Sequence, residues 1–199
     1  MATRTRLGPE ARRQQLLDIG IAMVADGDVA TVDDLRMDDV AGRAGVSKAL
    51  LFHYFPAKRD FAVAVARAAA ADLLTRTDLA PTDDLIDGLR ASVSAFVEYV
   101  EGRRDAYVGL VRGSAKGDAA MRAVYDETRD AITRRTLDAL ERGGLPHDDV
   151  VALAVRAWQA FVEEAVIAWL DDPRISRDRM LDLLVQSFLA IVGSTQSDP

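Results

Sequence analysis

Hydrophobic residues recur along almost the whole chain at the spacing of an amphipathic helix. In the first such segment, about residues 9–26, Leu16 and Met23 repeat at an interval of seven, as do Leu17 and Val24. A repeat of this kind places the residues on one helical face. β-Branched residues are few and do not alternate with polar ones, so the signal for strands is weak. The pattern predicts an all-α protein of about nine helices.

Proline and glycine mark where these helices begin and end. Pro9 suits a first helical turn, and Gly27 suits the end of the same helix. Read in this way, the helical segments are about residues 9–26, 37–44, 47–55, 58–76, 82–101, 106–115, 118–142, 147–170 and 176–192. We expect an N-terminal three-helix domain at residues 1–57 and a C-terminal helical bundle at residues 58–199.

The segment from Met37 to Phe61, MDDVAGRAGVSKALLFHYFPAKRDF, predicts two short helices joined by a turn at Gly45. Glycine suits such a turn because it adopts left-handed backbone angles at little cost. Apolar side chains of both helices would then face each other inside the hairpin: Val40, Ala41, Val46 and Leu51. This arrangement is typical of a helix-turn-helix, whose second helix lies in the major groove of double-stranded DNA.

The second helix of this hairpin supplies the candidate DNA contacts. Residues at its N-terminal end are expected to approach base edges, and those at its C-terminal end to donate to phosphates. The first group is Ser47, Lys48, Ala49 and Leu50, and the second is His53, Tyr54 and Lys58. Leu50 suits apolar contact with a thymine methyl group. For His53, an exposed position without a role is the alternative.

Charge is distributed unevenly along a chain whose net charge is −7. Residues 1–60 carry 9 Lys or Arg and 9 Asp or Glu, whereas residues 61–199 carry 16 and 23. The acidity therefore belongs to the C-terminal part, and a local basic face is what meets phosphate. Arg4 and Arg6 belong either to a solvated tail or to an arm that reaches the minor groove.

A run of positions follows one helix-turn-helix signature in register: Val40, Ala41, Ala44, Gly45, Val46, Ser47, Leu51, Tyr54, Phe55 and Lys58. On these residues the chain resembles the tetracycline-repressor (TetR) family of transcriptional regulators. Several positions depart from the family's usual residues: Arg36 replaces threonine, Ala49 glycine, Leu50 a small residue, and Phe52 tyrosine. At Arg36, a guanidinium would take the place of a phosphate-binding hydroxyl. The resemblance implies a repressor with a C-terminal ligand pocket that dimerises through its last two helices.

Aromatic and other apolar residues lie on several predicted C-terminal helices: Phe96, Tyr99, Tyr107, Val111, Met121, Tyr125, Trp158 and Phe161. Each one alone suits an ordinary core position, but together they can line an apolar cavity of the kind in which a helical bundle holds a ligand. Arg112, Gln159 and Glu163 are polar candidates nearby. Glu163 either points to solvent or anchors a ligand, because a buried charge is costly unless it is paired. We expect a small, largely apolar effector that releases the protein from a palindromic operator.

The last two predicted helices are apolar on more than one face. Their apolar band is too wide for a single core stripe and includes Leu181, Leu184, Val185 and Phe188. A helix that is apolar nearly all round is buried on two sides. In a chain of 199 residues, the second side is most simply another subunit, which predicts a homodimer.

Other classes of function find little support in the sequence. The chain has no cysteine, and its two histidines, His53 and His147, are far apart. We see no catalytic triad, metal cluster or cofactor loop, so we expect neither an enzyme nor a cofactor. A helical adaptor suits the composition but gives the Ser47–Lys58 pattern no role. Without a signal-peptide apolar region or an apolar run of about 20 residues, we expect a cytoplasmic protein that does not contact the membrane.

Overall fold

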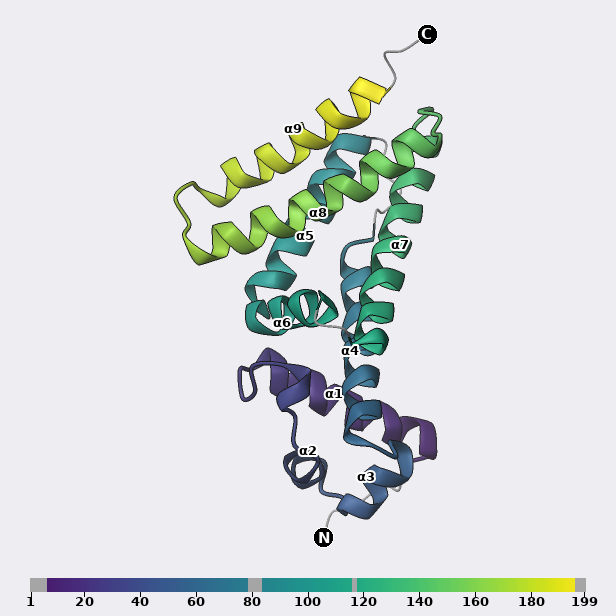
Figure 1. Ribbon diagram of the computed structural model, residues 1–199, viewed down its shortest axis with the longest axis vertical. Coiled ribbons are helices and arrows are strands. Elements are labelled where there is room, and N and C mark those ends of the chain that lie inside the picture. The colour runs from purple at the N-terminus through teal and green to yellow at the C-terminus, as the bar shows by residue number, and fades with distance from the viewer. Residues whose placement is uncertain (1–6, 79–83, 116–117, 196–199) are drawn as a thin grey trace. The chain divides into compact units, whose positions relative to one another are not determined.

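The computed structural model describes residues 7–78, 84–115 and 118–195, and the regular elements within these residues are all helical (Figure 1). The elements are α1 (Pro9–Ala25), the 3-10 helix η1 (Val32–Asp34), α2 (Met37–Ala44), α3 (Lys48–Tyr54), α4 (Lys58–Arg76), α5 (Leu85–Glu101), α6 (Arg104–Ala115), α7 (Ala119–Arg142), α8 (Asp149–Asp171) and α9 (Arg177–Thr195). The predicted all-α class is confirmed. Arg4 and Arg6 lie outside the described residues, as does the side chain of Arg112.

Several helices begin where a side-chain oxygen satisfies backbone N–H groups that have no partner within the helix. Asp148 caps α8 and accepts from the backbone N–H groups of Val150 and Val151, both at 2.9 Å. In the stretch before α2, Thr31 and Asp34 form a reciprocal capping box around η1. These local signals explain why most of the helix boundaries follow from the sequence.

The chain divides into two compact units. The first, which we call the N-terminal unit, comprises Met1–Ala70 and Asp105–Val124. Its largest fully buried side chains come from α1, the segment before α2, α2, α3 and α4: Leu16, Leu35, Val40, Leu51 and Phe61. At Gly20 of α1, an added Cβ would lie 2.6 Å from Val65 Cγ2, so the absence of a side chain allows α1 to approach α4 closely.

The N-terminal unit also includes α6 and the first turn of α7. A Cβ at Gly109 of α6 would meet Thr31 Cγ2 at 2.6 Å, so α6 packs directly against the segment before η1. At the start of α7, Met121 and Val124 are buried in a cluster with Ala62 and Ala66 of α4. The compact unit that contains the hairpin thus extends beyond residues 1–57, to Ala70 and to Asp105–Val124.

The second compact unit, the C-terminal unit, comprises Ala71–Arg104 and Tyr125–Pro199. In it α8 and α9 run side by side in opposite directions, and both pack on α5 (Figure 1). Trp158 of α8 fixes part of this packing, because its Nε1 donates to the Leu184 carbonyl at 3.1 Å and its ring meets Phe188 edge-on. The helices α4 and α7 each pass from one unit into the other.

Candidate functional site

The turn between α2 and α3 has the geometry that the sequence predicts. Gly45 ends α2 with φ of 62°, in the left-handed region that favours glycine. The next residue, Val46, donates its backbone N–H to the Ala41 carbonyl at 3.0 Å. Ser47 then caps α3, because its hydroxyl accepts from the Leu50 backbone N–H at 3.2 Å. The two helices are therefore held in a fixed hairpin before any DNA is bound.

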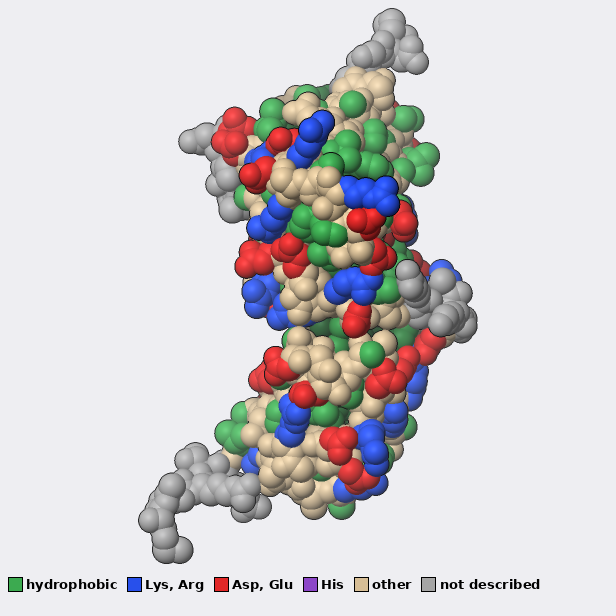
Figure 2. Space-filling model, turned by 90° about the vertical axis from the view of Figure 1, so that its left-hand side faces the viewer, with side chains coloured by type: hydrophobic (Ala, Val, Ile, Leu, Met, Phe, Trp, Pro, Cys, Tyr) green, Lys and Arg blue, Asp and Glu red, His purple; other side chains and the backbone are tan. Residues whose placement is uncertain are grey.

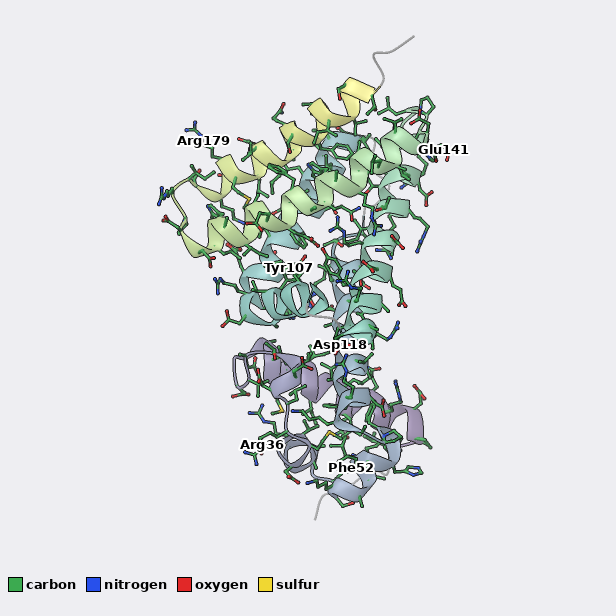
Figure 3. The ribbon with its side chains drawn as sticks, viewed as in Figure 1. Arg36, Phe52, Tyr107, Asp118, Glu141 and Arg179 are labelled. Carbon is green, nitrogen blue, oxygen red and sulfur yellow. The ribbon has the colours of Figure 1, made fainter. Side chains whose placement is uncertain are left out.

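The hairpin buries one side of α3 and leaves the other side open. Leu51 and Phe55 are buried with α1 and α2, and Phe52 packs partly against the same core (Figure 3). The exposed residues of α3 and its cap are Ser47, Lys48, Ala49, Leu50 and His53. Tyr54 is half-buried and meets the His53 ring edge-on. The residues that we expect to contact bases thus share one solvent-facing surface, which we call the reading face.

Lys48 on the reading face is already paired with a carboxylate. Its Nζ lies 2.9 Å from both carboxylate oxygens of Asp38, in the first turn of α2. Sequence reasoning did not find this ion pair. No local signal joins two residues ten positions apart across a turn, so only the folded hairpin shows it.

The ion pair leads to a prediction about affinity. Asp38→Asn is expected to tighten binding to DNA of any sequence roughly five-fold, because it removes a negative charge near the phosphates and releases Lys48; one charge at about 4 Å in water is worth about 1 kcal/mol. Fluorescence anisotropy with specific and random duplexes measures the change. Asp178→Asn on α9 removes the same charge far from α3 along the chain and should leave affinity unchanged. Weaker binding of Asp38→Asn would contradict the prediction.

The remaining candidate DNA contacts, Arg36 and Lys58, lie at helix starts. Arg36 is the N-cap residue of α2, caps no backbone N–H with its side chain, and is largely exposed, 3.9 Å from the Asp39 carboxylate (Figure 3). Lys58 is exposed and pairs with no acidic group among the described residues. Both side chains are therefore accessible to phosphate.

Arg59, next to Lys58, has a different role. Its guanidinium pairs with Asp118 at the start of α7 and lies 3.5 Å from the Asp33 carboxylate. The pKa of Asp118 is held below its usual value mainly by the backbone N–H of Met121, and also by Arg59. The pair ties the first turn of α4, which follows α3 directly, to the cap of α7.

The expected effector residues are divided between the two units. Tyr107, Val111 and Met121 belong to the N-terminal unit, and Phe96, Tyr99, Tyr125, Trp158 and Phe161 to the C-terminal unit. Trp158 is part of the contact between α8 and α9. Phe161 is 39% exposed. The eight residues are therefore not the lining of a single cavity within one unit.

The C-terminal unit contains an apolar pocket of about 190 Å³ that sequence reasoning did not find. It lies where the first turn of α5, the end of α7 and the end of α9 meet, and it is lined by Leu85, Ile86, Leu89, Leu140, Leu145, Phe188, Leu189, Val192 and Gly193. Its lining is almost wholly aliphatic, so it favours an apolar group without a charge.

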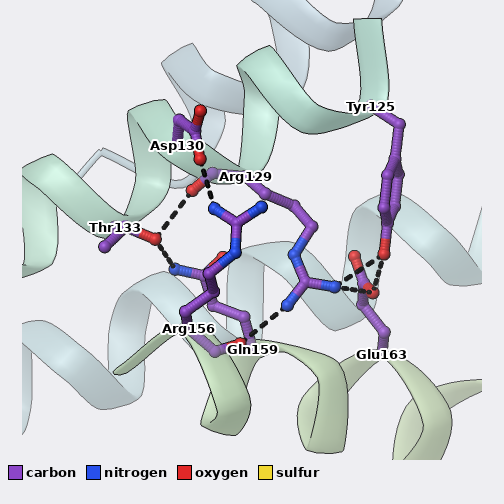
Figure 4. Close-up of polar contacts among 7 residues, drawn as sticks. All are labelled: Tyr125, Arg129, Asp130, Thr133, Arg156, Gln159 and Glu163. Carbon is purple, nitrogen blue, oxygen red and sulfur yellow. Dashed lines mark hydrogen bonds and ion pairs between the residues drawn. The ribbon is translucent and has the colours of Figure 1, made fainter. Parts of the chain in front are cut away.

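Polar side chains bridge α7 and α8 in the same unit (Figure 4). Tyr125 Oη donates to Glu163 Oε2 at 2.6 Å, and Arg129 Nη1 donates to the same Tyr125 oxygen at 2.7 Å. Burial raises the pKa of Tyr125, and the hydrogen bond to Glu163 raises it further. We call Tyr125, Arg129, Thr133, Gln159 and Glu163 the polar cluster. It contains two of the polar residues that the sequence singled out, Gln159 and Glu163.

The four residues expected at the dimer interface lie inside the protomer. Leu181, Leu184, Val185 and Phe188 are at most 5% exposed and face α5 and α8 in the core of the C-terminal unit. They cannot meet a second subunit without unfolding this packing. Sequence periodicity places them on an apolar face but does not say which of the two faces the protomer covers itself.

The outer surface of α8 is largely apolar, whereas that of α9 is mixed, since α9 also exposes Asp178, Arg179 and Asp182. The exposed positions of α8 follow a helical stripe at Val150, Leu153, Ala157, Ala160, Phe161, Glu164 and Ala168, and those of α9 include Leu183, Gln186, Ala190 and Gly193. We call these residues the outer stripe. Figure 2 shows hydrophobic side chains, interspersed with charged ones, on the upper part of this face, where α8 and α9 lie together with α5 and α7. Monomeric proteins rarely leave a continuous apolar stripe uncovered.

No described helix combines the length and the hydropathy needed to cross a bilayer. The described residues also hold no cluster of three or more His, Asp or Glu side chains suited to a metal ion.

A helical hairpin with a capped, solvent-facing second helix, followed by a helical bundle, defines a helix-turn-helix DNA-binding regulator. Residues 32–65 match the family model described as bacterial regulatory proteins, tetR family, and residues 85–191 match the tetracyclin repressor-like C-terminal domain. The chain belongs to the tetR family of transcriptional regulators, as its resemblance in the hairpin predicted.

Relatives and solved structures agree with this assignment. The transcriptional activator FasR of Mycolicibacterium smegmatis is 29% identical over 185 residues, which cover 91% of this chain and 83% of FasR. An HTH-type transcriptional regulator of Mycobacterium tuberculosis is 27% identical over 171 residues, 82% of this chain and 71% of the relative. A tetR-family regulator from Streptomyces coelicolor has a similar structure, with a TM-score of 0.82 and 28% identity over 96% of this chain and 85% of its own.

Proposed function

We propose that the chain is a ligand-responsive repressor that binds a palindromic operator as a homodimer and leaves it when a small, largely apolar effector binds. The observation that carries the DNA-binding part is the reading face, which presents Ser47, Lys48, Ala49, Leu50 and His53 on a hairpin fixed by Gly45 and the Ser47 cap. An operator-bound role of this kind would be carried out in the cytoplasm.

Dimerisation is proposed through the outer stripe of α8 and α9. Pairing these helices with their copies would form a four-helix interface and cover Leu153, Phe161 and Leu183, which are 69%, 39% and 50% exposed in the protomer. A two-fold axis would then place two copies of α3 in successive major grooves, about 34–36 Å apart or a near multiple. This geometry is why a palindromic operator is proposed.

Two lysine substitutions test the assignment of the reading face. Lys58→Ala should weaken binding about equally on all sequences and lower the salt slope by about 1, because it removes a phosphate contact. Lys48→Ala should instead reduce the preference for the operator over random DNA. Anisotropy titrations at several salt concentrations measure both effects. If both variants keep the wild-type operator affinity and salt slope, α3 is not the reading helix.

Activation of transcription is the alternative to repression, because the relative FasR is named a transcriptional activator. Repression is proposed here because the C-terminal family model is repressor-like. A reporter driven by the promoter next to the operator distinguishes them. Deleting the gene raises expression if the protein represses and lowers it if the protein activates.

The effector is proposed to bind in the C-terminal unit, with Phe96, Tyr99 and Tyr125 among its contacts. A regulator FadR from Bacillus subtilis with a similar fold, at a TM-score of 0.65 and 15% identity, was solved in complex with stearoyl-CoA. Moving an operator-bound population from 1:99 to 99:1 needs about 10⁴-fold differential affinity, or about 5.5 kcal/mol. If each subunit of a dimer binds one effector, each site needs only about a 100-fold higher affinity for the conformation that does not bind DNA. The helices α4 and α7, joined by the Arg59–Asp118 pair, are the proposed route to α3.

A further inference from the structure

The polar cluster between α7 and α8 is costly for the fold. The side chains of Arg129 and Glu163 are only 12% and 14% exposed, and their charged groups lie 3.2 Å apart. Removing two charges from water costs as much as or more than their attraction returns, so a buried pair of this kind is weak evidence for stability. Stability alone therefore does not account for this cluster, and we consider a role in binding a ligand.

Gln159 carries a buried polar atom that no other residue of the cluster satisfies. It is 6% exposed, and its Oε1 is buried without a hydrogen-bond partner among the described residues. The orientation of the amide is fixed by Thr133, whose hydroxyl already donates to the Arg129 carbonyl at 3.0 Å and therefore can only accept from Gln159 Nε2, at 2.9 Å. A buried acceptor left unsatisfied costs about 1–3 kcal/mol. Gln159 Oε1 is therefore a buried acceptor that lacks a donor in the ligand-free protein.

The charged side chains around Gln159 determine which kind of ligand group can donate to its Oε1. Arg129 already donates to Tyr125, to Glu163 and, at 2.7 Å, to the Arg156 carbonyl. Arg156 itself pairs with Asp130 (Figure 4). The charges of Arg129 and Arg156 are balanced by Glu163 and Asp130, so a ligand carboxylate would bring an additional, uncompensated negative charge into the cluster. A neutral group that carries a hydrogen, such as a hydroxyl, meets Gln159 Oε1 without adding a charge.

We propose that Gln159 Oε1 in the polar cluster accepts a hydrogen bond from the hydroxyl of the effector, which is therefore a neutral, largely apolar alcohol or phenol and not a carboxylic acid. This inference rests on the proposed function, since it names the class of effector for that switch. It assigns the polar cluster to ligand recognition, with Thr133 as the positioning residue that holds the Gln159 amide.

Three probes with the same apolar chain test the assignment: octanol, methyl octyl ether and octanoate. The ether keeps the oxygen of octanol but has no hydrogen to donate. Binding constants come from the concentration dependence of the thermal midpoint of the full-length protein. The wild type is expected to bind octanol about ten-fold tighter than the ether, since a satisfied buried acceptor is worth about one factor of ten. Octanoate is expected to bind more weakly than octanol.

Matched variants separate recognition from structure. Gln159→Leu should bring the octanol-to-ether ratio close to one without lowering the melting temperature of the ligand-free protein, and Gln159→Met serves if the leucine variant does not fold. Thr133→Val keeps Oε1 but removes the group that orients the amide, so the ratio should fall to a value between those of the wild type and Gln159→Leu. The inference is overturned if the wild type does not distinguish octanol from the ether, if none of the probes binds, or if the ratio survives in Gln159→Leu. A lower melting temperature for both Gln159→Leu and Gln159→Met would mark the cluster as structural only.

The same samples report on the switch independently. If octanol binds with the expected preference but leaves operator affinity unchanged, the site assignment stands and the proposed ligand release fails. If octanol and the ether bind equally tightly and both lower operator affinity, the proposed ligand release stands and the assignment of the hydroxyl to Gln159 fails.

Discussion

Leu183→Asp is expected to give a folded monomer that has lost operator binding, whereas Leu184→Asp is expected to unfold the protein. Leu183 is 50% exposed on the outer stripe and Leu184 is 0% exposed in the core. A monomer engages one half-site and loses the gain from linking two, on the order of 10²-fold in affinity or more. An unpaired charge at Leu184 costs about 4 kcal/mol or more, a large part of a domain's stability.

Sedimentation, circular dichroism and operator titration together check both variants. Asp87→Asn, an exposed change on α5 and outside the outer stripe, is the control and should remain a dimer. A Leu183→Asp protein that remains dimeric at micromolar concentration would show that the subunits meet elsewhere. A folded Leu184→Asp monomer would show that the residue faces a partner after all.

Arg129→Met is expected to lower the free energy of unfolding by about 3 kcal/mol, because it leaves the buried Glu163 carboxylate without its cation. The double variant Arg129→Met, Glu163→Leu should recover most of this loss, since an apolar pair of similar volume replaces a buried ion pair at little cost. Urea denaturation of the wild type, the single variants and the double variant gives the coupling energy of the pair.

Arg76→Met is the matched control for this cycle. Arg76 pairs with Asp72 one turn away on α4, but its side chain is 54% exposed. Exposed pairs contribute little, so the loss should stay below about 0.5 kcal/mol. Equal losses for Arg76→Met and Arg129→Met would mean that the polar cluster is solvated and that its burial has no consequence.

The helix-turn-helix was predictable because its determinants are local. The glycine that ends α2 and the serine that caps α3 act on backbone groups within a few residues, and both appear in the sequence as Gly45 and Ser47. The apolar positions that hold the hairpin, among them Val40 and Leu51, follow a helical period. Short-range chemistry of this kind can be recognised without a structure.

Contacts between distant residues were not predictable in the same way. The Lys48–Asp38 pair crosses a turn, and the Tyr125–Glu163 hydrogen bond joins residues 38 positions apart. Periodicity identified Leu184 and Phe188 as apolar but could not assign them to the core, because a helix buried on two faces has the same pattern on both. Only the packing of α9 against α5 and α8 separates these residues from Leu183.

Selection of bound sequences from a pool of random duplexes tests the central claim most directly. It shows whether the two copies of α3 in a dimer each recognise one half-site. We expect an enriched palindrome whose half-site centres are about one helical turn or a near multiple apart. We also expect that Lys48→Ala and Leu50→Ala each change the preferred bases inside the half-site, and that Lys58→Ala lowers recovery without changing them. Enrichment of a single, unpaired site, or the same palindrome from all three variants, would contradict the account.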